Sequence, residues 1–426
     1  MVDPPTLLAA LVRKAEMSHA EIVEGYQACA REHGEDAAIT VRTLRRWMAG
    51  DVRTNARPAQ RRVARLYWGH SMTQLLGSPQ IEQLNAEGTN ETTERRMAMS
   101  VRRALEFVSY AEGSNVGPET VDQLRDEVIR LASAYIRDPV ADFIGDLVTL
   151  QDNIFTLLEG KQRPGQSADL YVIAALACGM LAKASHDLAR PYEAMTQART
   201  MFVCAESAGH VPLQAWARGQ QSLTAYWIGR HEEAARFATG GAALLAGNHT
   251  GTVAAWLPAL EARAHAQLNR PEAARAALRR AAIARESIAA DEIDGVGGVL
   301  TFPPAMQAYY AAGTHVHLDG GDSKAIAEAN TSMELFESGG QRRWAVEAGV
   351  RGELALAHVH NGEIDGAKEV MAEVLALEPN RRIRGLVTTA QRLHTALRDP
   401  GFFASPVAKD LRDEIEAYCR IAAVTN

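Results

Sequence analysis

The sequence predicts an all-α protein with a small N-terminal helical domain followed by a long array of helical hairpins. Alanine is abundant and β-branched residues form no clusters, which favours helix over strand. Apolar residues recur at the three- and four-residue spacing of amphipathic helices. In the second half of the chain, a turn followed by a helix start recurs about every 40 residues. Together these observations predict helices throughout.

The chain length of 426 residues allows two or three domains, or one domain and a repeat array. We divide it into a helical domain at 1–78, a linker and helical connecting region at 79–167, and a repeat domain at 168–426. The four cysteines form no CxxC pair, which argues against a zinc site and suits a reducing cytoplasm. No export signal is visible, and the most apolar run, residues 171–181, is too short to span a bilayer. We therefore expect a cytoplasmic protein with no membrane partner.

The first domain is predicted to contain five short helices. The first covers residues 6–14, and the second begins at a capping serine, Ser18, and runs to about residue 32. A polar gap at 33–36 precedes the third helix at 40–50. Pro58 begins the fourth helix, and the fifth lies at 71–76.

The third helix combines an apolar face with a basic face. Thr40 is a good N-cap and Gly50 a good C-terminal stop. Leu44 and Trp47 face one way at helical spacing, whereas the opposite face carries Arg42, Thr43, Arg45 and Arg46. Such a helix can pack on a small core while its basic side meets phosphates and base edges of DNA. A solvated basic face is the alternative interpretation.

Charge is distributed unevenly along the chain. The net charge of −7, taken alone, argues against a nucleic-acid-binding protein. Between residues 40 and 66, however, a single acidic residue, Asp51, stands against many arginines: Arg42, Arg45, Arg46, Arg53, Arg57, Arg61, Arg62 and Arg65. A basic N-terminal module on an acidic body is expected when only one end contacts DNA.

Three stretches of this first domain resemble a phage-repressor-type (XRE-like) helix-turn-helix domain. They are Met-Ser-His-Ala-Glu-Ile-Val at 17–23, Thr-Leu-Arg-Arg-Trp-Met-Ala-Gly at 43–50, and residues 66–77; the Arg-Trp-x-x-Gly ending is the most specific part. The family usually has a tight turn between its second and third helices. The longer connection found here resembles that of an actinobacterial subgroup.

The resemblance implies double-stranded operator DNA as a partner. The predicted DNA-binding residues are Thr40, Arg42, Thr43, Arg45 and Arg46 at the major groove, with Arg53 and Arg57 on phosphates. One module buries too little surface to be very selective, so we expect a homodimer. Its half-sites would lie about 34 Å apart, or a multiple of that distance.

The connecting region is predicted to hold a polar linker at 78–90 and helices at about 94–111, 118–137 and 140–160. Beyond it, turn-plus-helix-start signals stand at residues 190–194, 230–234, 270–273, 321–325 and 362–367. The last unit resembles a tetratricopeptide (TPR) repeat, on Leu354, Ala355, Gly362, Ala367 and Pro379. Its longer period leaves HEAT-like packing as a competing description. An α-solenoid of TPR-like hairpins is therefore expected.

The groove of this solenoid is the expected ligand site. If the hairpins align, Trp216 and Trp256 occupy equivalent positions on successive first helices, and the same inner face carries Lys183, His186, Tyr226 and Arg263. Aromatic and cationic groups of this kind could hold a small molecule or a peptide carboxylate. The alternative is that the tryptophans are core between hairpins. Residues 291–304 are expected to form a loop that folds over an edge or into the groove.

Catalysis has little support in the sequence. No GxSxG, HExxH or Walker signature is present. His315 and His317, like His358 and His360, are two residues apart, so on a helix they point to different sides and make a poor metal site. We expect no enzyme activity, no cofactor and no bound metal.

The whole chain resembles actinobacterial transcription regulators of this layout, most clearly from residue 161 to 200 and at 204–210. The resemblance implies a helix-turn-helix domain that binds an operator and a repeat domain that dimerises and senses an effector. The alternative hypothesis is a scaffold, in which the repeats bind a protein partner and the first domain is a helical cap that does not bind DNA. Substituting Arg42, Arg45 and Arg46 would separate the two hypotheses.

Overall fold

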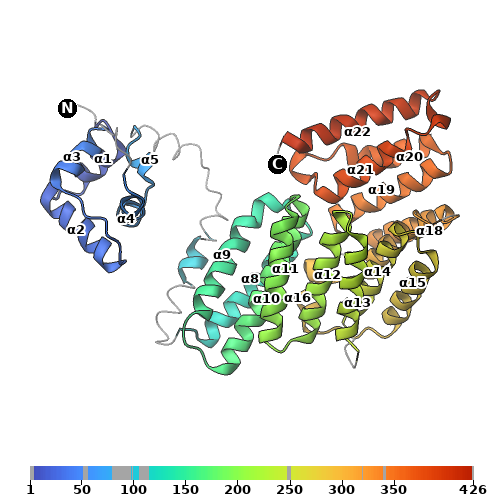
Figure 1. Cartoon of the computed structure of the whole chain (residues 1–426), viewed down its shortest axis with the longest axis horizontal. Coiled ribbons are helices and arrows are strands. Elements are labelled where there is room, and N and C mark those ends of the chain that lie inside the picture. Colours follow the sequence, from blue (N-terminus) through green and yellow to red (C-terminus); the bar gives the residue numbers. More distant parts are fainter. Residues whose placement is uncertain are drawn as a thin grey trace. The chain divides into compact units, whose positions relative to one another are not determined.

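The computed structural model describes residues 4–50, 56–78, 97, 99–104, 115–246, 251–318, 320–338 and 342–424, with side chains to residue 420. These residues form helices, turns and loops without strands (Figure 1), which confirms the all-α class. The chain divides into two compact units, Met1–Arg102 and Arg103–Asn426. Each unit has its own hydrophobic core.

The N-terminal unit contains the five expected helices. Serine and threonine side chains cap four of them by accepting backbone N–H bonds, as expected for helix starts. The helices are α1 (Leu7–Lys14), α2 (His19–Glu32), α3 (Val41–Met48), α4 (Pro58–Trp68) and α5 (Met72–Leu75).

The core of this unit is built around Tyr26 of α2. Its side chain is fully buried, and its ring meets the rings of Trp47, Tyr67 and Trp68 at centroid distances of 5.3–6.3 Å. The long connection between α2 and α3 takes part in this core through Ile39, whose carbonyl accepts a 2.8 Å hydrogen bond from Gln27 Nε2. The connection is therefore packed against the core although it is longer than a tight turn.

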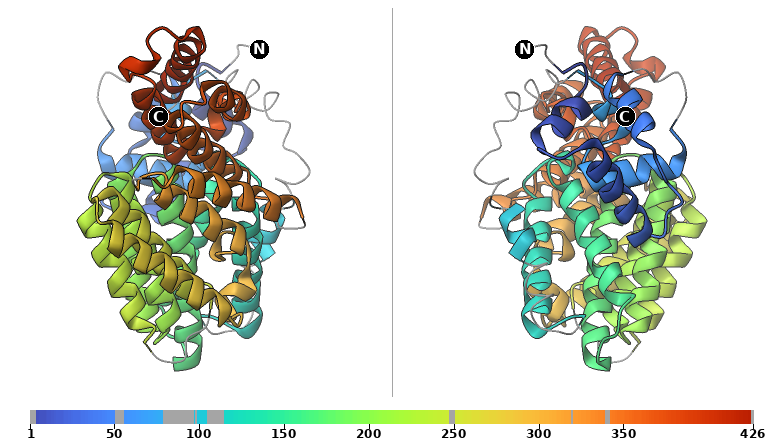
Figure 2. Two further views of the ribbon diagram at one scale, coloured as in Figure 1. Left: turned by 90° about the vertical axis from the view of Figure 1, so that its right-hand side faces the viewer. Right: turned by 90° about the vertical axis from the view of Figure 1, so that its left-hand side faces the viewer.

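The C-terminal unit begins with α8 (Pro118–Tyr135) and α9 (Val140–Leu158) and continues as a stack of hairpins. Successive first helices contact one another, and consecutive helices from α10 to α15 lie side by side in Figures 1 and 2. The hairpins are α10 (Pro164–Asp187) with α11 (Pro191–Ser207), α12 (Val211–Trp227) with α13 (His231–Leu244), α14 (Val253–Gln267) with α15 (Pro271–Glu286), α17 (Pro304–His315) with α18 (Asp322–Glu337), α19 (Trp344–His360) with α20 (Ile364–Leu375), and α21 (Arg384–Ala396) with α22 (Pro406–Val424). Short 3₁₀ turns lie at η2 (Pro379–Arg381) and η3 (Pro400–Phe402).

Helices α8 and α9 pack into the same core as the hairpins, although we expected them in a connecting region. Leu131 of α8, Leu147 of α9 and Leu170 of α10 are fully buried in this shared core. The first of the three helices expected in the connecting region, at about 94–111, lies largely outside the described residues. The repeat unit is therefore more extensive than the sequence periodicity alone suggests.

The hairpin turns share one backbone feature. The second helix begins at each of the five positions that the sequence signals marked. Just before that helix the chain passes through a left-handed residue in every case. These residues are Ala189 (φ 59°), Gly229 (φ 79°), Asn269 (φ 54°), Gly320 (φ 64°) and Gly362 (φ 78°). The left-handed residue lets the chain reverse within a short turn.

The irregular segment between the third and fourth hairpins packs inward. It contains α16 (Glu292–Val296) and the 3₁₀ turn η1 (Gly298–Leu300), and both contact α8. At Gly298 a Cβ atom would lie 2.0 Å from the backbone oxygen of Ala132, so only glycine allows this approach. Leu300 and Phe302 of this segment are themselves buried. Of the two placements expected for this loop, packing on the inner side is the one observed.

Candidate functional site

Helix α3 presents the predicted DNA-binding residues on one face. Leu44 and Trp47 are buried, whereas Arg42, Arg45 and Arg46 are exposed and Thr43 is half-buried. Thr40 caps the helix, because its Oγ1 accepts a hydrogen bond of 3.2 Å from the Thr43 backbone N–H. The helix is therefore anchored from behind, and its basic side is exposed, with Arg45 Nε 3.5 Å from His19 Nδ1.

The other arginines of the basic module have different surroundings. Arg62 is held by Glu35 through two hydrogen bonds of 2.5 and 2.8 Å, and this contact lowers the pKa of Glu35. The Nε of Arg61 donates to the backbone oxygen of Ala56 at 2.9 Å. Arg57 is exposed at the start of α4, and Arg53 lies outside the described residues. Exposed arginines therefore lie on both α3 and α4, where Arg61, Arg62 and Arg65 are also exposed.

The six residues expected in the ligand groove are divided between two places. Lys183, Trp216 and Trp256 line a cavity in the C-terminal unit. His186, Tyr226 and Arg263 do not line it. The groove expected from helix alignment is therefore only partly correct as a description of this surface.

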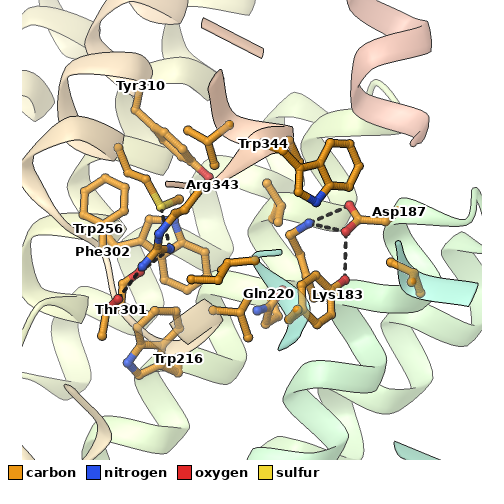
Figure 3. Close-up of a pocket in the computed structure, with 18 residues that line it drawn as sticks. Lys183, Asp187, Trp216, Gln220, Trp256, Thr301, Phe302, Tyr310, Arg343 and Trp344 are labelled. Atoms are coloured by element: carbon orange, nitrogen blue, oxygen red, sulfur yellow. Dashed lines mark hydrogen bonds and ion pairs between the residues drawn. The ribbon is translucent and has the colours of Figure 1, made fainter. Parts of the chain in front are cut away.

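The cavity lies between the end of α10, the middle of α12, the starts of α14, α17 and α19, and the inward-packed segment at 291–303 (Figure 3). Its volume is about 80 Å³, enough for a few water molecules or a small ligand. Its wall is mostly apolar. The lining residues are Tyr135, Ile136, Val140, Lys183, Asp187, Trp216, Gln220, Leu223, Trp256, Val299, Thr301, Phe302, Met306, Tyr310, Arg343, Trp344, Ala345 and Val346.

One side of the cavity carries a closed polar group. The ammonium of Lys183 donates to both carboxylate oxygens of Asp187 at 2.5 Å. The hydroxyl of Tyr135 donates to the same carboxylate at 2.8 Å, and burial raises the pKa of this tyrosine. The charge of Lys183 is therefore balanced within the protein.

The other side carries Arg343, which the sequence analysis did not single out. Its side chain is buried, with 5% of the residue exposed. The guanidinium donates to the carbonyl oxygens of Gly298 and Thr301, to Thr301 Oγ1 at 2.6 Å, and to the sulfur of Met306. All of these acceptors are uncharged. Burial lowers the pKa of Arg343 to about 10, so the group remains protonated at neutral pH.

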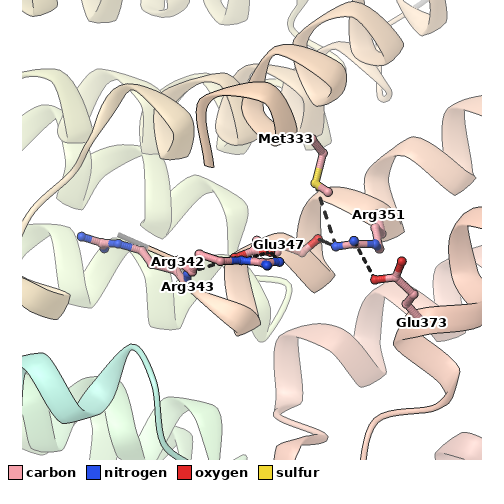
Figure 4. Close-up of polar contacts among 6 residues, drawn as sticks. All are labelled: Met333, Arg342, Arg343, Glu347, Arg351 and Glu373. Carbon is pink, nitrogen blue, oxygen red and sulfur yellow. Dashed lines mark hydrogen bonds and ion pairs between the residues drawn. The ribbon is translucent and has the colours of Figure 1, made fainter. Parts of the chain in front are cut away.

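The nearest acidic residue in sequence does not neutralise Arg343. Glu347 accepts from the guanidinium of Arg342 and from the backbone N–H of Arg343 (Figure 4). Arg351, on the next turn, pairs with Glu373 at 2.6 Å. The hydrogen bond from Arg342 lowers the pKa of Glu347. This carboxylate is therefore already engaged with other donors.

Arg263 and Tyr226 belong to a second, filled cluster. Arg263 is 2% exposed, and its guanidinium carbon lies 4.8 Å from the ring centroid of Tyr226 and 4.9 Å from that of Tyr310. Its Nη2 donates to Glu353 at 3.1 Å. His186 lies near this cluster, beside the ring of Trp227, and burial lowers its pKa to about 4. These three predicted residues are core in this structure.

Trp216 and Trp256 pack between successive hairpins, as the core interpretation expects, and they also face a cavity. Each is 3% exposed, and their ring centroids lie 4.4 Å apart between successive hairpins. They also form part of the cavity wall. The two tryptophans are thus inter-hairpin core on one side and cavity lining on the other.

Of the two histidine pairs, His358 and His360 are each engaged with a carboxylate. His358 Nδ1 lies 2.6 Å from Glu363, and His360 Nδ1 lies 3.0 Å from Asp322. Within the described ranges, no three side chains of the metal-binding types come together.

Helix α10, with 24 residues, is long and apolar enough to cross a membrane by length and composition, but 67% of its apolar window is buried in the protein.

No protein-family model matches the chain, and no curated protein shows significant similarity to it.

Proposed function

We propose that this protein is a sequence-specific DNA-binding transcription regulator whose C-terminal unit dimerises and responds to a small effector. The observation that carries the proposal is the exposed basic face of α3, with Arg42, Arg45 and Arg46 in front and Leu44 and Trp47 buried behind.

The geometry of α3 suits the major groove of DNA. The groove admits one α-helix, and arginine is the side chain that most often reads guanine there. Because Trp47 and Leu44 hold the helix on the core, its basic side chains share one orientation. Thr40 and Thr43 at the capped N-terminus add hydroxyl groups that can meet phosphates or bases.

The second unit would provide dimerisation and sensing. Two copies would bring two α3 helices onto half-sites about 34 Å apart, or a multiple of that spacing. An effector that favours one curvature of the hairpin stack would change the separation of the two heads. It can shift the balance only by its difference in affinity between the two shapes.

The test begins with DNA fragments selected by the purified full-length protein. A palindromic consensus sequence would support both DNA reading and two-fold symmetry. The triple variant R42A/R45A/R46A should then lose at least about 100-fold in affinity for the selected site, with a shallower salt dependence.

The matched control is R279A/R398A/K409A, which removes the same positive charge from exposed positions of the C-terminal unit. It should bind the site as the unchanged protein does. If no DNA sequence is enriched, or if both triple variants bind equally, the proposal is wrong. Retention of a protein partner by the α3 variant, without any DNA footprint, would instead favour the scaffold.

A further inference from the structure

The cavity in the C-terminal unit has an unbalanced charge. Among its lining residues, Lys183 and Arg343 are basic and Asp187 alone is acidic. The lysine and the aspartate neutralise each other, which leaves the guanidinium of Arg343. A buried charge with only uncharged hydrogen-bond partners is costly, and an anion brought beside it recovers part of that cost.

The unpaired polar atoms on this wall are of one kind. The Nε of Arg343 and the indole Nε1 of Trp344 are buried and have no hydrogen-bond partner. Both atoms are donors, so the group missing from this wall is an acceptor. Figure 3 shows both side chains on the cavity wall, with Arg343 beside Thr301 and the indole of Trp344 toward the Lys183–Asp187 pair. Unsatisfied buried donors are uncommon in folded proteins and point to an absent partner.

The remaining lining residues determine what kind of group can accompany the acceptor in the ligand. Trp216, Trp256 and Phe302 supply flat aromatic surface, and Leu223 and Val140 add aliphatic surface. Such a wall suits an apolar group and disfavours a highly charged one such as phosphate, which needs more donors than this wall offers. A volume of about 80 Å³ suits a molecule smaller than a peptide.

We infer that the cavity binds a small organic acid, with its carboxylate beside Arg343 and Trp344 and its apolar body between Trp216, Trp256 and Phe302. The acid is the effector class of the proposed regulator, and in that role the inference rests on the proposed function. The binding site itself depends only on the contacts of the C-terminal unit.

The first experiment measures binding to the full-length protein by calorimetry at pH 7, without DNA. The probes are propanoate and butanoate, which match a cavity of about 80 Å³, each with its neutral amide as the matched control. At least one acid should bind in saturable fashion, and its amide should bind at least about 10-fold more weakly, because the amide cannot neutralise the arginine.

Two variants test whether Arg343 and Trp344 cause the preference for the acid over the amide. In R343Q the preference of acid over amide should fall to less than about 3-fold, because the positive charge is gone. Since Arg343 also holds the segment at Gly298 and Thr301, circular dichroism must show that this variant is folded. W344F keeps the ring and removes one donor, so it should weaken the acid by about 3- to 10-fold. If R343Q does not fold, the inference is judged from the acid-to-amide affinity ratio of the unchanged protein and from the acid affinity of W344F.

Several results would overturn the inference: no saturable binding by either acid, equal binding of acid and amide, or an acid preference that is unchanged in folded R343Q and in W344F. Binding of inorganic phosphate or of a free-carboxyl tripeptide, with no binding of the acids, would also overturn it. Operator binding is measured on the same preparation. Acid binding without DNA binding would contradict the proposed function but support the acid site. DNA binding without acid binding would support the proposed function but contradict the acid site.

Discussion

Arg263 and Glu353 form an ion pair in the interior of the C-terminal unit, although 90 residues separate them in the chain. The guanidinium of Arg263 donates to the carboxylate over 3.1 Å, and the two side chains are 2% and 1% exposed. The pair joins α14 to α19, across the hairpin that begins with α17. Gly313 of α17 makes room for it, because a Cβ atom there would lie 3.0 Å from Glu353 Oε1.

Breaking this pair from one side should be strongly destabilising. E353L leaves the buried guanidinium without its carboxylate, and we expect the free energy of unfolding of the C-terminal unit to fall by about 3–5 kcal/mol. The measurement is urea denaturation followed by circular dichroism. The double variant R263M/E353L is the control and should recover most of the loss, because no unpaired charge remains. A double variant as unstable as the single variant would contradict this explanation.

The left-handed turn residues predict a stabilising substitution. Ala189 adopts φ 59°, a region that costs a residue with a Cβ atom about 1–2 kcal/mol. A189G should therefore raise the free energy of unfolding by about 0.5–1 kcal/mol after the greater entropy of glycine in the unfolded chain is subtracted. Ala208 has φ −79° at the end of α11, so A208G should be neutral or destabilising. Thermal unfolding of both variants tests the assignment, and equal shifts in Tm would refute it.

Buried histidines predict a loss of stability in mild acid. Burial lowers the pKa of His186 to about 4 and that of His317 to about 3, the latter with help from Arg392 and Arg263. Both are neutral in the folded protein, whereas the unfolded chain takes up protons near pH 6.5. Stability should be level above that pH and fall toward pH 4, by up to about 1.4 kcal/mol per pH unit for each histidine.

The check is urea denaturation of the unchanged protein and of H186Q and H317Q at intervals between pH 8 and pH 4.5. Each variant should have a shallower dependence of unfolding free energy on pH than the unchanged protein. At pH 8 the imidazoles are neutral in both states, so measurements there isolate the packing cost of each substitution. Parallel curves for all three proteins would show that these histidines do not govern the acid sensitivity.

Features with local causes could be predicted from the sequence. Thr40 as a cap, Trp47 as an apolar anchor and the helix starts after Arg190, Arg230 and Arg270 all depend on residues close in the chain. Helical periodicity and capping report such short-range relationships directly. This is why the helices and the two faces of α3 agree with the structure.

Features with long-range causes could not be predicted. Arg343 gains its role from Gly298 and Thr301, more than 40 residues earlier, in a segment with no periodicity. Lys183 looked available for a ligand, but Asp187, four residues further along α10, pairs with it. The supporting contact from Tyr135 becomes visible only once α8 is placed on α10. Alignment of helices also put Arg263 on the same face as Trp216, whereas the structure uses Arg263 in the core.

The docking of the 291–303 segment on α8 has a practical consequence for dissecting the molecule. An expression fragment that starts at residue 168, where the repeats become visible, would lack the helix on which Gly298 rests. The turn η1 would then lose the helix on which it packs, and the pocket would lose the wall that Tyr135 and Val140 provide. Fragments intended to retain ligand affinity should therefore start ahead of Pro118, so that they include α8 and α9 together with the repeats.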